Sequence, residues 1–156
     1  MQWQANPYFQ LLFIAGLIGL INVFFISRRL KVAGALPLLG MGLAVSEWAL
    51  AYAMELASSE LAMQIFWGKI QYFGIVSVSV LFFLFAITYT QSHILKSKWL
   101  WSIWVFPLIC VMLIWTNDLH HLVWTTISQK DFGSYVVASF GHGPIFYLFV
   151  AYSYIM

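Results

Sequence analysis

Long apolar runs separated by short polar segments dominate the chain. Five runs that are nearly free of charge occupy residues 8–27, 35–57, 62–90, 99–115 and 144–156. A helix needs about 20 apolar residues, at ~1.5 Å of rise each, to cross the ~30 Å hydrocarbon core of a bilayer. The first four runs therefore predict four full transmembrane helices. The fifth run predicts the first part of another helix.

The longest polar stretch, residues 116–143, interrupts this pattern before the fifth run. Residues 122–128 and 134–140 are rich in Val, Ile, Thr, Tyr and Phe, the residue types that strands favour. They flank residues 129–133, a set of turn formers that ends in Gly133. We predict a β-hairpin that caps the outer end of the helix bundle, with an irregular loop as the alternative.

The composition agrees with a membrane protein. Hydrophobic residues make up 63% of the chain and charged residues 8%, and the mean hydropathy is +0.89. A soluble domain carries about 25% charged residues, because its surface faces water. We therefore expect an all-α, polytopic helical bundle in the cell membrane, forming a single domain over residues 1–156 with the lipid bilayer as its solvent. No charged stop follows the fifth run, so we expect the natural protein to continue beyond it.

Basic residues in the connecting segments predict the orientation. Five of the seven lie after the first and third runs, namely Arg28, Arg29, Lys31, Lys96 and Lys98. The loop after the fourth run holds one, Lys130, beside two aspartates. The positive-inside rule places the basic loops in the cytoplasm and the amino terminus outside. No element carries a basic stripe, which argues against nucleic acid as a partner.

Three charged residues fall within the apolar runs. Glu55 lies at the outer end of its run, where solvation is a sufficient explanation, but Glu47 and Lys69 each need a reason because a charge at the bilayer centre costs at least ~2.5–3.5 kcal/mol. If the second and third runs form an antiparallel pair that turns at Ser58 and Ser59, Glu47 lies at the depth of Ile70, next to Lys69. We therefore expect a Glu47–Lys69 ion pair or water-bridged contact. In the alternative, Lys69 reaches the outer interface and Glu47 faces a wet cavity.

A proline interrupts the fourth run. Pro107 has no amide hydrogen, so the carbonyl of Ile103 loses its helical partner and a kink is expected at Pro107. The kink is either a signalling hinge or only a matter of shape.

The outer loop region contains the residues most open to a chemical role. His120, His121 and His142 occur there with Asp118 and Asp131, and such side chains can bind zinc or copper. Interfacial polar residues that line the mouth of a ligand site are the favoured alternative, because adjacent histidines point in different directions. The chain has no phosphate-binding loop, nucleophile elbow or zinc-protease motif, so we predict no enzyme activity and no cofactor.

Several segments in a fixed order resemble a known family. They are residues 47–56 (EWALAYAMEL), 66–74 (FWGKIQYFG), 82–90 (ending ITYT), Pro107, 114–124 (IWTNDLHHLVW) and Gly143–Pro144. Together they resemble the histidine kinase N-terminal seven-transmembrane region, a membrane sensor module. The resemblance implies seven helices, an amino terminus outside, and a following cytoplasmic signalling domain such as a histidine kinase or diguanylate cyclase.

The resemblance makes a sensory input module the leading interpretation. A small ligand is expected in the outer half of the bundle, at a polar site that comprises Glu47, Trp48, Glu55, Trp67, Lys69, Tyr72, His120, His121 and Trp124. The missing signalling domain and a second copy of the chain are further candidate partners. A fragment of a small transporter or channel is the alternative, and a membrane scaffold protein is a third interpretation.

Overall fold

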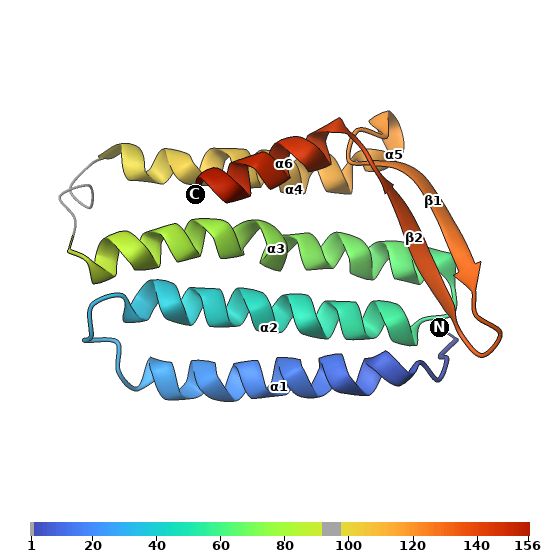
Figure 1. Ribbon diagram of the computed structural model, residues 1–156, viewed down its shortest axis with the longest axis horizontal. Coiled ribbons are helices and arrows are strands. Elements are labelled where there is room, and N and C mark those ends of the chain that lie inside the picture. The colour runs from blue at the N-terminus through green and yellow to red at the C-terminus, as the bar shows by residue number, and fades with distance from the viewer. Residues whose placement is uncertain (1, 92–97) are drawn as a thin grey trace.

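The computed structural model describes residues 2–91 and 98–156, which are largely helical. Three long helices, α1 (Pro7–Ser27), α2 (Ala35–Ala57) and α3 (Leu61–Tyr89), lie antiparallel in a row (Figure 1). Two shorter helices, α4 (Val105–Trp115) and α6 (Pro144–Ile155), cover the side of α3 that faces away from α2 (Figure 1). The predicted helical bundle is therefore present in outline.

The three long helices match the first three apolar runs to within about a residue at most ends. Each is long and apolar enough to cross a membrane. Local chemistry sets the boundaries: the side chain of Asn6 accepts a hydrogen bond from the Tyr8 amide, and Pro7 occupies the first helical position. Gly34, with φ of 82°, makes the left-handed step into α2. Lys96 of the predicted inner loop lies outside the described residues.

Small residues let the first two helices approach closely. A Cβ atom on Gly19 would collide with the Ser46 hydroxyl of α2. That hydroxyl instead donates to the carbonyl of Gly42 on its own helix at 2.7 Å, so it needs no partner across the interface. Close packing of this kind drives helix association in lipid, where the hydrophobic effect between helices is absent.

The fourth apolar run departs from the prediction of one continuous helix over residues 99–115. The chain forms a 3₁₀ helix, η2 (Lys98–Trp104), and becomes α-helical only at Val105. Pro107 therefore lies in the first turn of α4 and not in the middle of an α-helix. The Tyr152 hydroxyl of α6 donates to the carbonyl oxygen of Ile103 at 2.5 Å. The carbonyl that Pro107 leaves without an amide partner is thus satisfied by a neighbouring helix.

The predicted β-hairpin is confirmed. Strands β1 (Trp124–Asp131) and β2 (Val136–His142) pair antiparallel, with an irregularity between Trp124 and Thr126. β1 reaches further toward the turn than the predicted residues 122–128, whereas β2 begins and ends two residues later than the predicted 134–140. The turn is closed by the Gly133 amide, which donates to Asp131 Oδ1 at 2.7 Å while Gly133 adopts a φ of 83°. The short helix α5 (Asn117–His120) precedes the hairpin.

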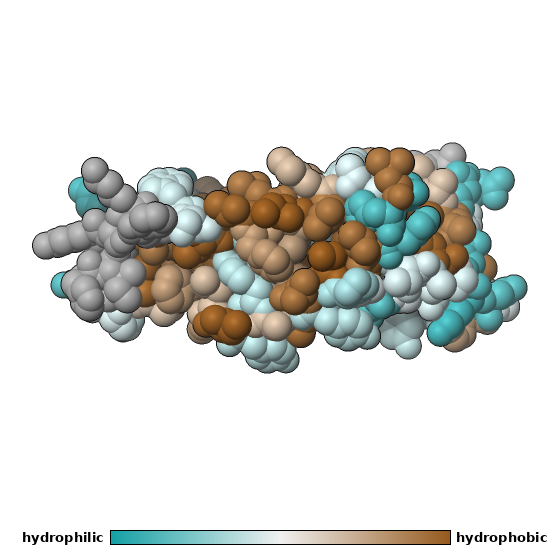
Figure 2. All heavy atoms as spheres, turned by 90° about the horizontal axis from the view of Figure 1, so that it is seen from above, coloured by the Kyte–Doolittle hydropathy of each residue, from teal (hydrophilic) through white to brown (hydrophobic). Residues whose placement is uncertain are grey.

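The hairpin crosses one end of the helix bundle, which we call the hairpin end (Figure 1). It starts beside α6 and reaches the amino terminus of α1. The buried core lies between α3, α4, α6 and the start of β1, with Tyr72, Ile114, Trp124 and Phe149 among its members. Figure 2 shows apolar side chains over the middle of the molecule and hydrophilic ones gathered at the hairpin end. The distribution matches a bilayer around the middle of the helices.

Candidate ligand-binding site

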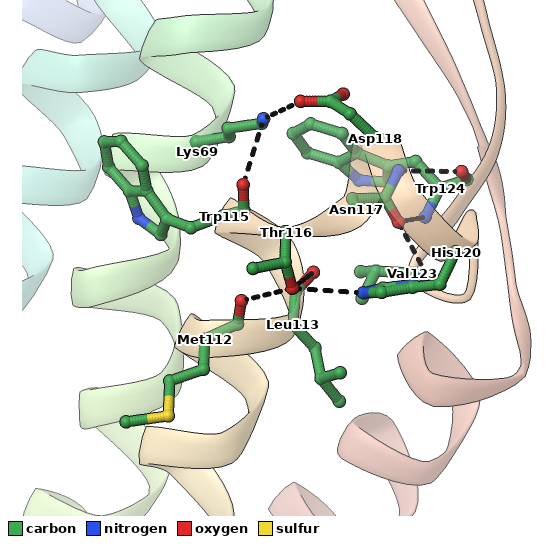
Figure 3. Close-up of polar contacts among 10 residues, drawn as sticks. All are labelled: Lys69, Met112, Leu113, Trp115, Thr116, Asn117, Asp118, His120, Val123 and Trp124. Atoms are coloured by element: carbon green, nitrogen blue, oxygen red, sulfur yellow. Dashed lines mark hydrogen bonds and ion pairs between the residues drawn. The ribbon is translucent and has the colours of Figure 1, made fainter.

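Asn117 organises the polar contacts at the hairpin end. Its side chain is fully buried. Its Oδ1 accepts from the backbone amides of Val123 and Trp124, each at 3.0 Å, and its Nδ2 donates to the Trp124 carbonyl at 3.0 Å (Figure 3). One amide side chain thus satisfies three backbone groups and fixes the start of β1 on α5.

Lys69 pairs with an acid on α5. Its Nζ lies 2.8 Å from Asp118 Oδ2 and 3.5 Å from the carbonyl oxygen of Trp115 (Figure 3). The Lys69 side chain is 10% exposed and that of Asp118 is 68% exposed. Asp118 and the helix end at Trp115 therefore take the place of Glu47 as partners. The predicted direct Glu47–Lys69 ion pair is wrong.

The Glu47 carboxylate meets α3 at Gly74, four residues or about one helical turn from Ile70, the level that the sequence suggested. It lies against the backbone of Gly74, whose missing side chain makes room for it. Side chains on a helix lean toward its amino terminus, so side chains at one level on antiparallel helices lean in opposite directions. Glu47 leans away from the hairpin end and Lys69 leans toward it, which separates the two charges.

Both carboxylate oxygens of Glu47 are buried without a hydrogen-bond partner among the described residues. Two adjoining hollows, of about 590 and 270 Å³, share Glu47 and Leu43 in their linings. Trp67 lines the larger hollow, and its indole Nε1 is also buried without a partner in the described part of the chain. We call this region between α1, α2 and α3 the Glu47 groove.

An aromatic cluster packs the hairpin against α3. Trp124 is 2% exposed, stacks on Phe140 at 4.2 Å between ring centroids, and meets Tyr72 edge-on at 5.8 Å. A Cβ atom on Gly68 would lie 3.2 Å from the Trp124 ring, so the hairpin rests directly on α3. Tyr72 and Trp124, both predicted site residues, are brought together as core residues.

Glu55 is buried, although a solvated position at the end of its helix was expected. It is 4% exposed and accepts a hydrogen bond from the side chain of Gln71 on α3. Trp48, by contrast, is 41% exposed on the surface of α2. Glu55 therefore ties α2 to α3, whereas Trp48 faces the surroundings.

The two histidines of the loop have different roles. His120 Nδ1 accepts from the Leu122 amide at 3.0 Å, and its Nε2 lies 3.2 Å from the Thr116 hydroxyl (Figure 3). His121 is in the left-handed conformation, with φ of 53°, at the end of α5. Within residues 2–91 and 98–156, no three His, Cys, Asp or Glu side chains are placed to hold a metal ion.

Three glutamines at the hairpin end, of which Gln64 is fully buried, are polar residues that the sequence analysis missed. Gln64 Nε2 donates to the carbonyls of Ser58 (2.8 Å) and Val136 (3.0 Å), and Gln129 Nε2 donates to Gln64 Oε1 at 2.9 Å. Gln4 binds the same two carbonyls from the amino-terminal segment. We call Gln4, Gln64 and Gln129 the glutamine cluster. The signal was available, because Gln64 lies seven residues before Gln71 on one apolar helix, a spacing that places both on one face.

Comparison with known proteins gives one match. The sequence model for the family described as the N-terminal 7TM region of histidine kinase matches residues 11–156. No curated protein and no solved structure matches the chain.

Proposed function

Because the chain belongs to the family of N-terminal 7TM regions of histidine kinase, we propose that it senses a small ligand in the half of the bundle that the hairpin covers. Regions of this family are the sensory input modules of histidine kinases and are not themselves catalytic. The family match favours a sensor over a transporter fragment. In this proposal the 156 residues act as one sensor domain, and a linked cytoplasmic kinase or cyclase reads its state.

The proposed topology has four spans, with the amino terminus outside the cytoplasm. The 7 residues of η2 and the 11 of α4 together reach roughly 30 Å, because a 3₁₀ helix rises ~2.0 Å per residue. That length suits a fourth crossing. Basic residues concentrate at the end opposite the hairpin, which favours the cytoplasm there.

The observation that carries the ligand proposal is the pair of unsatisfied polar groups in the Glu47 groove. Buried polar atoms in proteins almost always have partners, and a charge within the membrane marks a functional position. Glu47 carries two acceptor oxygens and Trp67 carries one N–H donor, and both residues line a hollow with otherwise apolar walls. The groove has the size of an ordinary small-molecule pocket.

These groups define the ligand by its chemistry. Its body is apolar and reaches the groove from the lipid. It carries a hydrogen-bond donor for Glu47 and an acceptor for the Trp67 N–H group. An amine is the best donor, because its positive charge compensates the carboxylate. Binding between α1, α2 and α3 stabilises one arrangement of these helices over another, and only such differential affinity moves a signalling equilibrium.

The proposal is tested with the full-length protein in lipid nanodiscs. The probes are a dansyl-labelled alkylamine and a neutral dansyl-labelled alkane of the same length. We expect saturable binding of the amine, weakened roughly 10–100-fold by Glu47→Gln, because a charge-assisted hydrogen bond is worth ~1.5–3 kcal/mol. Trp67→Phe keeps an aromatic ring but removes the N–H donor. It should weaken binding of the alkylamine probe less than Glu47→Gln does.

Asp131→Asn is the matched control, since it removes an acid from the hairpin turn, outside the groove. Autophosphorylation of the full-length protein is the second readout. Adding the amine should change it in the wild type and in Asp131→Asn, but not in Glu47→Gln. Equal binding of the amine by the wild type and Glu47→Gln would contradict the proposal. So would equal binding of the amine and the alkane.

A further inference from the structure

The end of the bundle opposite the hairpin carries positive charge without internal compensation. Arg28, Arg29 and Lys31 lie in the connection between α1 and α2. The sequence has five acidic residues, and none is in this connection or in the parts of α2 and α3 that adjoin it; they are Glu47, Glu55, Glu60, Asp118 and Asp131. Within residues 1–156 no acidic side chain is therefore placed in sequence to neutralise this end.

A pocket of about 400 Å³ lies at this end. It is enclosed by the end of α1, the connection, the start of α2 and the end of α3, and its walls include Phe25, Val32, Leu38 and Phe85. Arg29 is the charged residue among the described residues that line it. The pocket thus combines apolar walls with one guanidinium group.

The backbone at Gly34 packs closely against one wall of this pocket. Gly34 has a φ of 82°, and a Cβ atom on it would lie 3.1 Å from two ring carbons of Phe85. A left-handed glycine therefore lets the connection pack directly on α3. Gly34 and Ala35 are buried in this contact, whereas Arg29, Val32 and Ala33 of the same lining are exposed.

The two neighbouring arginines differ. The Arg28 guanidinium lies 4.7 Å above the ring of Phe24, in a cation–π contact on α1. Arg28 does not line the pocket, whereas Arg29 does. The two residues have the same charge and adjacent positions, so they form a matched pair for an experiment.

We propose that this pocket holds an anionic phospholipid, with an acyl chain between the apolar walls and the phosphate paired with Arg29. Charge complementarity selects the occupant, because basic pockets between transmembrane helices at the membrane surface bind anionic head groups. Arginine suits the role since its planar guanidinium binds phosphate through two parallel hydrogen bonds. The proposal rests on the membrane placement of the helices and is independent of the Glu47 groove.

Native mass spectrometry of the full-length protein, with phosphatidylglycerol or phosphatidylcholine added, tests the site. We expect the wild type to retain one phosphatidylglycerol about tenfold better than phosphatidylcholine. Arg29→Gln should abolish this preference, and Arg28→Gln should leave it within about twofold. Arg29→Lys should retain only part of it, because lysine keeps the charge but not the two parallel hydrogen bonds. Ala33→Leu, at an exposed position in the pocket lining, should weaken retention by filling the space for the chain.

Inorganic phosphate is the probe that separates a lipid from a free anion. Phosphate should fail to displace phosphatidylglycerol, because it cannot occupy the apolar part of the pocket. Displacement by phosphate would assign the site to a free anion and overturn the proposal. Equal retention of both lipids would also overturn the proposal. So would equal losses of phosphatidylglycerol in Arg28→Gln and Arg29→Gln, because they would indicate a general attraction of the basic segment for anionic lipid.

Discussion

The hairpin end and the Glu47 groove differ in whether their buried polar side chains have hydrogen-bond partners. At the hairpin end Asn117 and Gln64 are fully buried, and the chain supplies each with several hydrogen-bond partners. In the groove, Glu47 and Trp67 keep buried polar atoms without partners in the described part of the chain. The first arrangement holds an architecture together, and the second leaves interactions open for a molecule from outside. Hydrogen bonding therefore distinguishes polar residues that stabilise the bundle from polar residues that are available to a ligand.

The largest expected loss comes from Asn117→Ala. The change strips partners from the amides of Val123 and Trp124 and from the Trp124 carbonyl, and each buried group left unsatisfied costs ~1–3 kcal/mol. We expect the free energy of unfolding in detergent micelles to fall by about 3 kcal/mol or more. The measurement is thermal unfolding followed by tryptophan fluorescence. Asn22→Ala, which removes an exposed amide from α1, should be nearly neutral. A comparable loss in Asn22→Ala would mean that the hydrogen bonds of Asn117 contribute nothing special to stability.

Gln64→Leu should cost less, about 2 kcal/mol. Leucine fills the same space, but it cannot donate to the carbonyls of Ser58 and Val136; Gln4 still binds both and limits the loss. Hydrogen exchange of the β2 amides should speed up, since this contact holds the hairpin on α3. Gln10→Leu, at an exposed position of α1, is the control. Unchanged exchange in β2 would mean that the glutamine cluster does not anchor the hairpin.

The Lys69–Asp118 pair should show a coupling of ~1 kcal/mol in a double-mutant cycle of Lys69→Met and Asp118→Asn. The coupling is small because the Asp118 side chain is 68% exposed and screened by solvent. The same cycle between Lys69→Met and Glu47→Gln should give none. Coupling of Lys69 to Glu47 in place of Asp118 would restore the arrangement that the sequence suggested.

Tyr152→Phe should lower the free energy of unfolding by ~1 kcal/mol, because the carbonyl of Ile103 loses its donor. Combined with Pro107→Ala the cost should shrink, since residue 107 then has an amide hydrogen that can bond to the same carbonyl. Tyr147→Phe, on the exposed face of α6, is the matched control. If the loss is unaffected by Pro107→Ala, the hydroxyl does not substitute for the missing amide.

Glu47→Gln should cause the smallest loss of stability, none or a slight gain, because it replaces a buried carboxylate that makes no hydrogen bond in the described part of the chain with a neutral amide. Unfolding of the ligand-free protein in micelles provides the measurement. A loss as large as that of Gln64→Leu would show that Glu47 belongs to the architecture, and the comparison between the two regions would fail.

Much of the outline follows from pattern alone. The apolar runs predict α1, α2 and α3, and the strand formers around residues 129–133 predict the hairpin. These features depend on local chemistry, on the length of apolar sequence and on the residue types that turns require. The fourth helix was predicted as uniform because hydropathy does not distinguish an α-helix from a 3₁₀ helix. Pro107 gave the position of the disturbance, but the hydroxyl of Tyr152 that compensates it lies 49 residues beyond Ile103 in the sequence.

The sequence by itself determined which segments are surrounded by lipid, where the charges gather, and that Glu47 and Lys69 are exceptional. Only the tertiary structure decided which side chains meet. Depth in the membrane follows from counting residues along a helix, but the direction of a side chain also depends on the rotation of the helix and on the opposite lean of antiparallel neighbours. That is why Lys69 meets Asp118, Glu47 faces Gly74, and the unsatisfied carboxylate became visible as a candidate binding group.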